Sequence, residues 1–179
     1  LIITHCVGTT RTTTRGPEGP RAKACLEFFV EEGEIRGLKY SGPATQPKDF
    51  MSFCSLKYVQ DVKLDLVYDM HEYSPPYDDT VENICNTVAS LPHLSSVSLS
   101  VIDVDGSYRM ENYTRKRPNL CFLGQVFAQA SCLLSLELDL YGARLRDQIP
   151  QIAEDLVKGC DSLKSMHLCL GMNEMTHIE

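Results

Sequence analysis

The sequence lacks the short motifs that mark common catalytic and metal-binding sites. Neither glycine-rich phosphate-binding pattern, GxGxxG or GxxxxGK[ST], occurs in its 179 residues. The eight cysteines form no CxxC pair and no Cys/His spacing of the zinc-site type, and the acidic residues of the segment 103–118 lack EF-hand spacing. The five histidines are scattered, without a spacing that predicts a catalytic pair. We therefore expect no cofactor and no bound metal ion.

Long apolar runs and excess positive charge are also missing. No apolar run approaches the roughly 20 residues that span a bilayer, and no secretory leader is recognisable. There are 17 Lys and Arg residues against 24 Asp and Glu, which gives a net charge of −7. The basic clusters at residues 9–15 and 115–117 are not interleaved with aromatic residues, as single-strand binders require. We expect no membrane insertion, no nucleic-acid binding, and a protein partner with a basic or polar surface.

The cysteines predict a reducing compartment. Most of them stand where an apolar residue belongs, as buried free thiols do, and we expect a cytoplasmic protein. They are Cys6, Cys25, Cys54, Cys85, Cys121, Cys132, Cys160 and Cys169. The tripeptide that begins at Asn112 matches an N-glycosylation acceptor, but such tripeptides are common by chance. Because the chain begins at Leu1 without an initiator Met, we expect residues 1–179 to be one segment of a longer protein.

The clearest strand pattern lies in Leu133–Leu140. Leucines alternate there with polar residues, at Leu136, Leu138 and Leu140 against Ser135, Glu137 and Asp139. A period of two is typical of a strand that buries one face and exposes the other to water. Similar alternation predicts strands near residues 1, 38, 62, 97, 136 and 166.

Helical patterns precede most of these strands. Apolar residues at i, i+3, i+4, i+7 and i+8 predict amphipathic helices over 22–30, 81–89, 120–128 and 149–157, with a shortened copy over 50–54. We predict helix caps at Thr80, Asn119 and Asp147, and a left-handed helix end at Gly159. Alternating strands and helices predict parallel strands with helical crossovers.

Two architectures satisfy this alternation, a solenoid with helices on one side and a doubly wound sheet with helices on both. Strands of a doubly wound sheet are buried on both faces and tend to be continuously apolar. Here the strands carry polar residues at alternate positions: Lys63, Asp65, Ser96, Ser98, Ser100, Glu137, Asp139 and His167. This favours a sheet with one face in water.

The strands also resemble the leucine-rich-repeat superfamily over about residues 35–171. Its LxxLxL motif is matched at Val59/Val62/Leu64, Leu94/Val97/Leu99, Leu133/Leu136/Leu138 and Leu163/Met166/Leu168. The resemblance, to ribonuclease-inhibitor-like and NLR-type repeats, implies an irregular solenoid with parallel strands on the concave face and helices on the convex face. The chain departs from the motif where Asn or Cys normally follows, and strands near 38, 62, 97, 136 and 166 are 24, 35, 39 and 30 residues apart. Ordinary repeats span about 20–29 residues.

The exposed strand face is the predicted binding surface. The residues that we predict to contact a partner are Lys63, Asp65, Ser98, Ser100, Glu137, Asp139, Tyr141 and His167. Although Glu137 and Asp139 could form a carboxylate pair, an open face keeps carboxylates solvated, which favours binding over acid–base catalysis. The resemblance implies a non-enzymatic protein, either the ligand-sensing or autoinhibitory part of an NLR-type innate-immune receptor or a substrate-recruiting ubiquitin-ligase subunit. The alternative is a compact doubly wound α/β enzyme with its active site in the loops after the strands.

Overall fold

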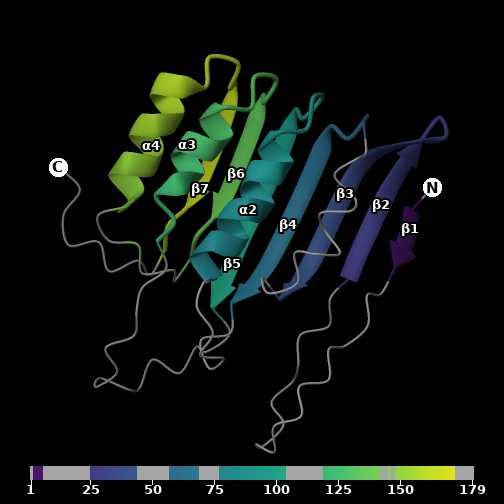
Figure 1. Ribbon diagram of the computed structural model, residues 1–179, viewed down its shortest axis with the longest axis horizontal. Helices are drawn as coiled ribbons and strands as arrows, with labels where there is room; N and C mark the ends of the chain where they lie inside the picture. The colour runs from purple at the N-terminus through teal and green to yellow at the C-terminus, as the bar shows by residue number, and fades with distance from the viewer. Residues whose placement is uncertain are drawn as a thin grey trace, which may run out of the picture.

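The protein is a mixed α/β chain built on one open sheet (Figure 1). The computed structural model describes residues 2–5, 25–43, 57–68, 77–103, 119–141, 145 and 148–171. The elements in these residues are, in chain order, β1 (Ile2–His5), β2 (Cys25–Glu31), β3 (Glu34–Pro43), β4 (Asp61–Tyr68), α2 (Tyr77–Ala89), β5 (Ser96–Asp103), α3 (Phe122–Ala128), β6 (Ser135–Asp139), α4 (Gln148–Gly159) and β7 (Ser165–Cys169).

The order of strands in the sheet is the order of strands in the chain, from β1 at one edge to β7 at the other. β1, β2 and β3 pair antiparallel, and β3 to β7 pair parallel, as predicted for that part of the sheet. All three helices of the described residues lie in one layer on the same face of the sheet (Figure 1). A doubly wound sheet would place helices on both faces.

The helix predicted over 22–30 is wrong, because residues 25–31 form strand β2. Its buried residues are Leu26 and Phe28, two apart, so the true period is two. β2 and β3 form a hairpin whose turn residues, Glu32 and Gly33, have φ values of 52° and 82°. Positive φ at both turn residues is the type I′ geometry that tight hairpins favour. The N-terminal part of the sheet is therefore antiparallel rather than a further strand–helix crossover.

The other helices in the described residues confirm the predictions, although their predicted ends are less accurate. Thr80 is not a cap, because α2 already begins at Tyr77. The predicted cap at Asn119 is also wrong, because Cys121 is the N-cap residue of α3; the Asn119 side chain instead accepts a hydrogen bond from the Cys121 backbone N–H at 3.3 Å. Gly159 ends α4 without a positive φ, so the predicted left-handed conformation is wrong. The predicted cap at Asp147 and the predicted helix over 50–54 lie outside the described residues.

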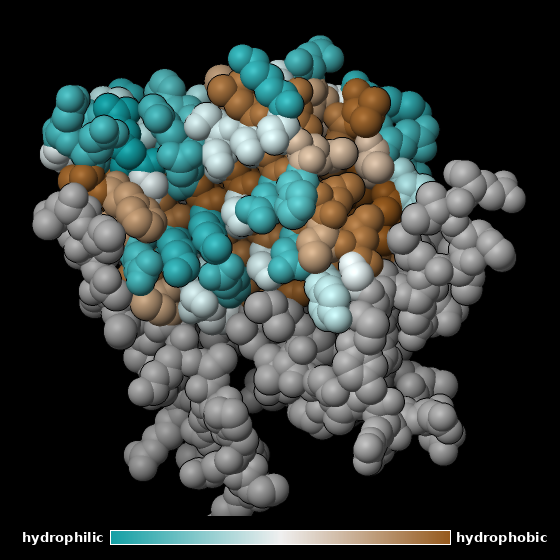
Figure 2. Space-filling view, turned by 180° about the vertical axis from the view of Figure 1, so that it is seen from behind, coloured by the Kyte–Doolittle hydropathy of each residue, from teal (hydrophilic) through white to brown (hydrophobic). Residues whose placement is uncertain are grey.

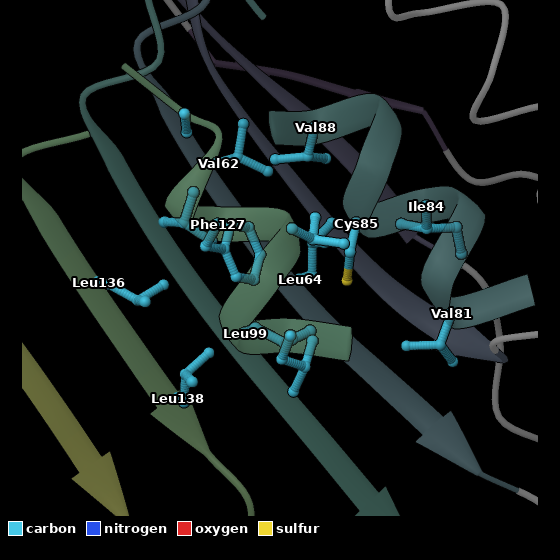
Figure 3. Close-up of a cluster of buried hydrophobic side chains, with 14 of the residues drawn as sticks. Val62, Leu64, Val81, Ile84, Cys85, Val88, Leu99, Phe127, Leu136 and Leu138 are labelled. Carbon is cyan, nitrogen blue, oxygen red and sulfur yellow. The ribbon is translucent and has the colours of Figure 1, made fainter. Parts of the chain in front are cut away.

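The core lies between the sheet and the helical layer. Val81, Ile84, Cys85 and Val88 of α2 are fully or almost fully buried and face the sheet (Figure 3). Strand residues in matching register meet them, among them Val62, Leu64, Leu99, Leu136 and Leu138, with Phe127 of α3 in their midst (Figure 3). Burying an apolar side chain of this size stabilises the fold by about 1.5–3 kcal/mol. The helical stripe and the strand alternation therefore form one continuous core.

A repeated backbone contact joins the turns that lead into the parallel strands. The carbonyl of Gln60 accepts hydrogen bonds from the N–H groups of Ser95 and Ser96 at 2.8 and 3.0 Å. In the same way, Ser95 O accepts from residues 134 and 135, and Leu134 O accepts from residues 164 and 165, at 2.8–3.0 Å. We call these contacts the turn ladder. Because they use backbone atoms only, they stack successive turns whatever side chains those turns carry.

Candidate functional site

The sheet face opposite the helices brings together seven of the eight predicted contact residues. In the register of β3–β7, one row of aligned positions runs Lys39, Lys63, Ser98, Glu137 and His167. A second row runs Ser41, Asp65, Ser100, Asp139 and Cys169. We call them the Lys63 row and the Asp65 row. Figure 2, turned by 180° from Figure 1, shows this open face, with hydrophilic side chains projecting from it and hydrophobic surface between them.

Charge is unevenly distributed along the Lys63 row. Lys39 and Lys63 make its β3–β4 end positive, although Lys39 Nζ lies 3.7 Å from the Glu27 carboxylate. At the other end, Glu137 Oε1 lies 3.6 Å from His167 Nδ1, and the two side chains form an ion pair when the imidazole is protonated. Glu137 and His167 are both exposed, so the pair is hydrated and contributes little to stability. These side chains are consequently available to a partner.

The Asp65 row is less exposed and has a structural role at Asp139. The Asp139 Oδ1 atom accepts a hydrogen bond from the Tyr141 backbone N–H at 3.2 Å, which shapes the end of β6. Tyr141, the eighth predicted residue, lies beyond the strand and is 53% exposed. A Cβ atom added to Gly171 would lie 2.7 Å from the Tyr141 ring, so the ring rests on the backbone of Gly171. An aromatic side chain held in this way can anchor a binding partner.

Sequence reasoning missed one residue of this face and a separate aromatic cluster near it in the chain order. The first is Lys39, which the register places beside Lys63 and which the alternation with Leu38 and Tyr40 could have identified. The second lies at the start of the parallel strands, where the exposed Tyr58 ring stacks on His93 with ring centroids 6.2 Å apart. Arg36 and Lys57 lie 5.6 and 5.5 Å from the centroid of the Tyr58 ring. The spacing in the sequence could have identified this stack, because residues 58 and 93 each lie four residues before Val62 and Val97, which are aligned in the sheet.

Other polar groups lie within the helical layer. The Asp155 Oδ1 atom accepts a hydrogen bond from Gln151 Nε2 at 2.9 Å, whereas its buried Oδ2 atom has no partner among the described residues. Burial and the nearby Asp155 carboxylate raise the pKa of the Cys121 thiol. A cavity of about 240 Å³ lies between the ends of α3 and α4. None of the predicted contact residues lines it, so the open face remains the main candidate surface.

The thiols differ sharply in accessibility, which gives a chemical test of the fold. Complete burial raises the pKa of the Cys85 thiol far above its usual range, and the Glu82 carboxylate adds to this effect, whereas Cys132 is exposed. Because thiolates are the reactive form, we expect iodoacetamide to modify Cys132 at least about a hundred times faster than Cys85 in the folded chain. Peptide mass mapping measures both rates. If Cys85 and Cys132 react at equal rates in the folded chain, Cys85 is not buried. If their rates become equal only when urea unfolds the chain, the buried position of Cys85 is supported.

The described residues contain no group of three or more His, Cys, Asp or Glu side chains that could hold a metal ion. No helix in this part of the chain is both long enough and apolar enough to cross a membrane. Comparisons with models of known protein families, with curated proteins and with solved structures find no match.

Proposed function

We propose that the chain is a leucine-rich-repeat-like solenoid segment that binds another protein through its open sheet face. The observation that carries this proposal is the register of β3–β7, which aligns polar and charged side chains into two rows while one layer of helices covers the opposite face. A broad, solvated sheet face suits a protein surface better than it suits a small molecule, which normally requires a concave and mostly apolar pocket.

The turn ladder supports the repeat part of the proposal. Three successive turns make the same pair of backbone hydrogen bonds to the turn before them, and a helix precedes each of β5, β6 and β7. Such stacking of equivalent units is the basis of solenoid architecture. Roles in an NLR-type receptor or in a ubiquitin-ligase substrate receptor follow from the motif resemblance, and we retain both as forms of the proposed binding function.

Electrostatics indicates which partner surface fits. Glu137 and Asp139 lie on adjacent rows of one strand, and Asp65 lies two strands away in the Asp65 row. Neighbouring strands are about 4.8 Å apart, so Asp65 and Asp139 are separated by about 10 Å across the sheet. A partner that presents Lys or Arg side chains at this spacing would pair with both carboxylates, and such complementarity mainly increases specificity and the association rate.

Removing both carboxylates that β6 contributes to the open face should strongly reduce partner capture. The test variant combines Glu137→Lys with Asp139→Asn, because asparagine keeps the side-chain oxygen that accepts the Tyr141 N–H. Tagged wild-type and variant chains are used to capture proteins from cells, and bound proteins are quantified by mass spectrometry. We expect at least one partner to fall by about tenfold or more, since losing a charged contact at an interface costs about 1.4 kcal/mol or more.

The matched control is Glu154→Lys, which makes the same kind of charge change on the helical layer. Glu154 is exposed and pairs with Lys158 one helical turn away, so this substitution should leave the fold and partner capture intact. Circular dichroism must show the same folded signal for all three proteins. If the open-face variant captures the same proteins as the wild type, the open face is not the binding surface.

A further inference from the structure

The strand at the end of the parallel sheet is much less well covered than its neighbours. Met166 of β7 is 40% exposed, whereas the residues aligned with it in β4, β5 and β6 are Val62, Val97 and Leu136, which are 1–3% exposed. Leu168 is only partly buried, although its partner Leu138 is fully buried. β7 therefore presents an apolar face of the kind that every other parallel strand buries.

The outer side of α4 shows the same difference. On α3, Gly124 and Ala128 receive α4 so closely that a Cβ atom on Gly159 would lie 2.5 Å from the Ala128 Cβ atom. Aligning the buried residues Phe127 and Leu156 makes Val157 the equivalent of Ala128. Val157 is 77% exposed, so α4 carries an apolar residue at the position where α3 receives its neighbour.

The turn ladder ends at the same edge. Its accepting carbonyls belong to Gln60, Ser95 and Leu134, and the next equivalent residue in the chain is Lys164, in the turn before β7. Among the described residues no strand follows β7 in the sheet. The strand β7, the helix α4 and the turn before β7 thus each leave uncovered, at one edge, the surface through which the preceding strands, helices and turns contact their neighbours.

We propose that the edge formed by β7 and α4 is a docking surface for a further helix-and-strand unit, with its strand parallel to β7. Its strand would carry apolar residues opposite Met166 and Leu168, and its helix would pack against Val157. Two N–H groups of its turn would bind the Lys164 carbonyl, which continues the existing interface between units. An edge strand with an exposed apolar face favours such pairing because an uncovered edge leaves backbone groups unpaired. This inference does not depend on partner binding by the open face.

The test supplies such a unit within the full chain. A copy of residues 142–171 is inserted directly after Gly171, and hydrogen exchange of the β7 backbone amides is compared with and without the insertion. We expect exchange of β7 to slow by about tenfold or more, because a paired and covered strand opens less often. A second insertion, a copy of residues 104–141 at the same point, should have the same effect.

Met166→Lys provides the matched variant. The substitution should leave the thermal midpoint of the original chain unchanged, because the side chain is partly exposed there, and should lower it in the extended chain, where the edge is covered. If neither insertion protects β7, the proposal is overturned. It is also overturned if sedimentation shows that the original chain pairs with a second copy and that Met166→Lys abolishes the pairing, since the occupant would then be another copy of the chain.

Discussion

Replacing Phe127 with alanine should lower the free energy of unfolding by about 3–5 kcal/mol. Phe127 is completely buried and is the largest fully buried side chain of the core. It projects from α3 toward the strands, among residues of α2, β5 and β6 (Figure 3). Truncation removes the apolar contacts of the ring and leaves a cavity. The sheet cannot collapse to fill this cavity, because hydrogen bonds to neighbouring strands hold each strand in place.

Urea unfolding, followed by circular dichroism, measures this loss as a shift of the midpoint at constant slope. Val157→Ala is the matched control, because it also removes apolar atoms from the helical layer but at a position that is 77% exposed. We expect the control to change stability by less than about 0.5 kcal/mol. Equal effects of the two substitutions would contradict the position of the core between α3 and the sheet.

Gly124→Ala should also destabilise the chain, by about 1 kcal/mol, although alanine is a better helix former than glycine. A Cβ atom at position 124 would lie 2.7 Å from the Ile152 carbonyl oxygen and 2.8 Å from the Asp155 Cβ atom. Neither contact can be relieved by rotating a flexible side chain, so α3 and α4 must move apart. Overpacking of this kind costs about 1–3 kcal/mol, which exceeds the gain in helix propensity of about 1 kcal/mol or less.

Gln125→Ala is the control for Gly124→Ala, because Gln125 is the next residue of α3 and is exposed. Thermal unfolding of both variants should show a lower midpoint for Gly124→Ala only. A rise in the midpoint of Gly124→Ala would mean that helix propensity outweighs the close approach, and that α3 and α4 are further apart than the structure indicates.

Much of the parallel half of the sheet could be predicted from the sequence, because each element there has a regular period. Leu136, Leu138 and their polar neighbours alternate without interruption, and β6 follows that alternation. Seven of the eight predicted contact residues fall on one face for the same reason. A period of two determines the face of each strand, even where the distance between strands in the chain is irregular.

The N-terminal hairpin could not be predicted by the same reasoning, because its apolar residues fit two periods. Cys25, Leu26, Phe29 and Val30 match a helical stripe, while Leu26 and Phe28 match a strand. Pairing between β2 and β3 shifts register between Phe29 and Val30, so the strand itself departs from strict alternation. The glycine at position 33, followed by a second alternating segment, is the local signal that favours the hairpin.

The position of Gly159 shows how tertiary packing can override a local signal. A glycine near a helix end predicts a left-handed cap, but this residue remains helical and permits α4 to approach Ala128. The spacing of residues in the sequence does not show that Gly159 and Ala128 are neighbours; this contact is evident only when α3 and α4 lie side by side. Contacts between helices therefore account for much of what sequence periodicity leaves undetermined.

The turn ladder has a consequence for how this protein can evolve. Its acceptors are carbonyl groups of Gln60, Ser95 and Leu134, three residues with unrelated side chains, so substitutions at these positions leave the stacking bonds available. The side chains of the open face likewise contribute little to the core. New binding specificities can therefore arise by exchanging surface residues, row by row, without a compensating change in the scaffold.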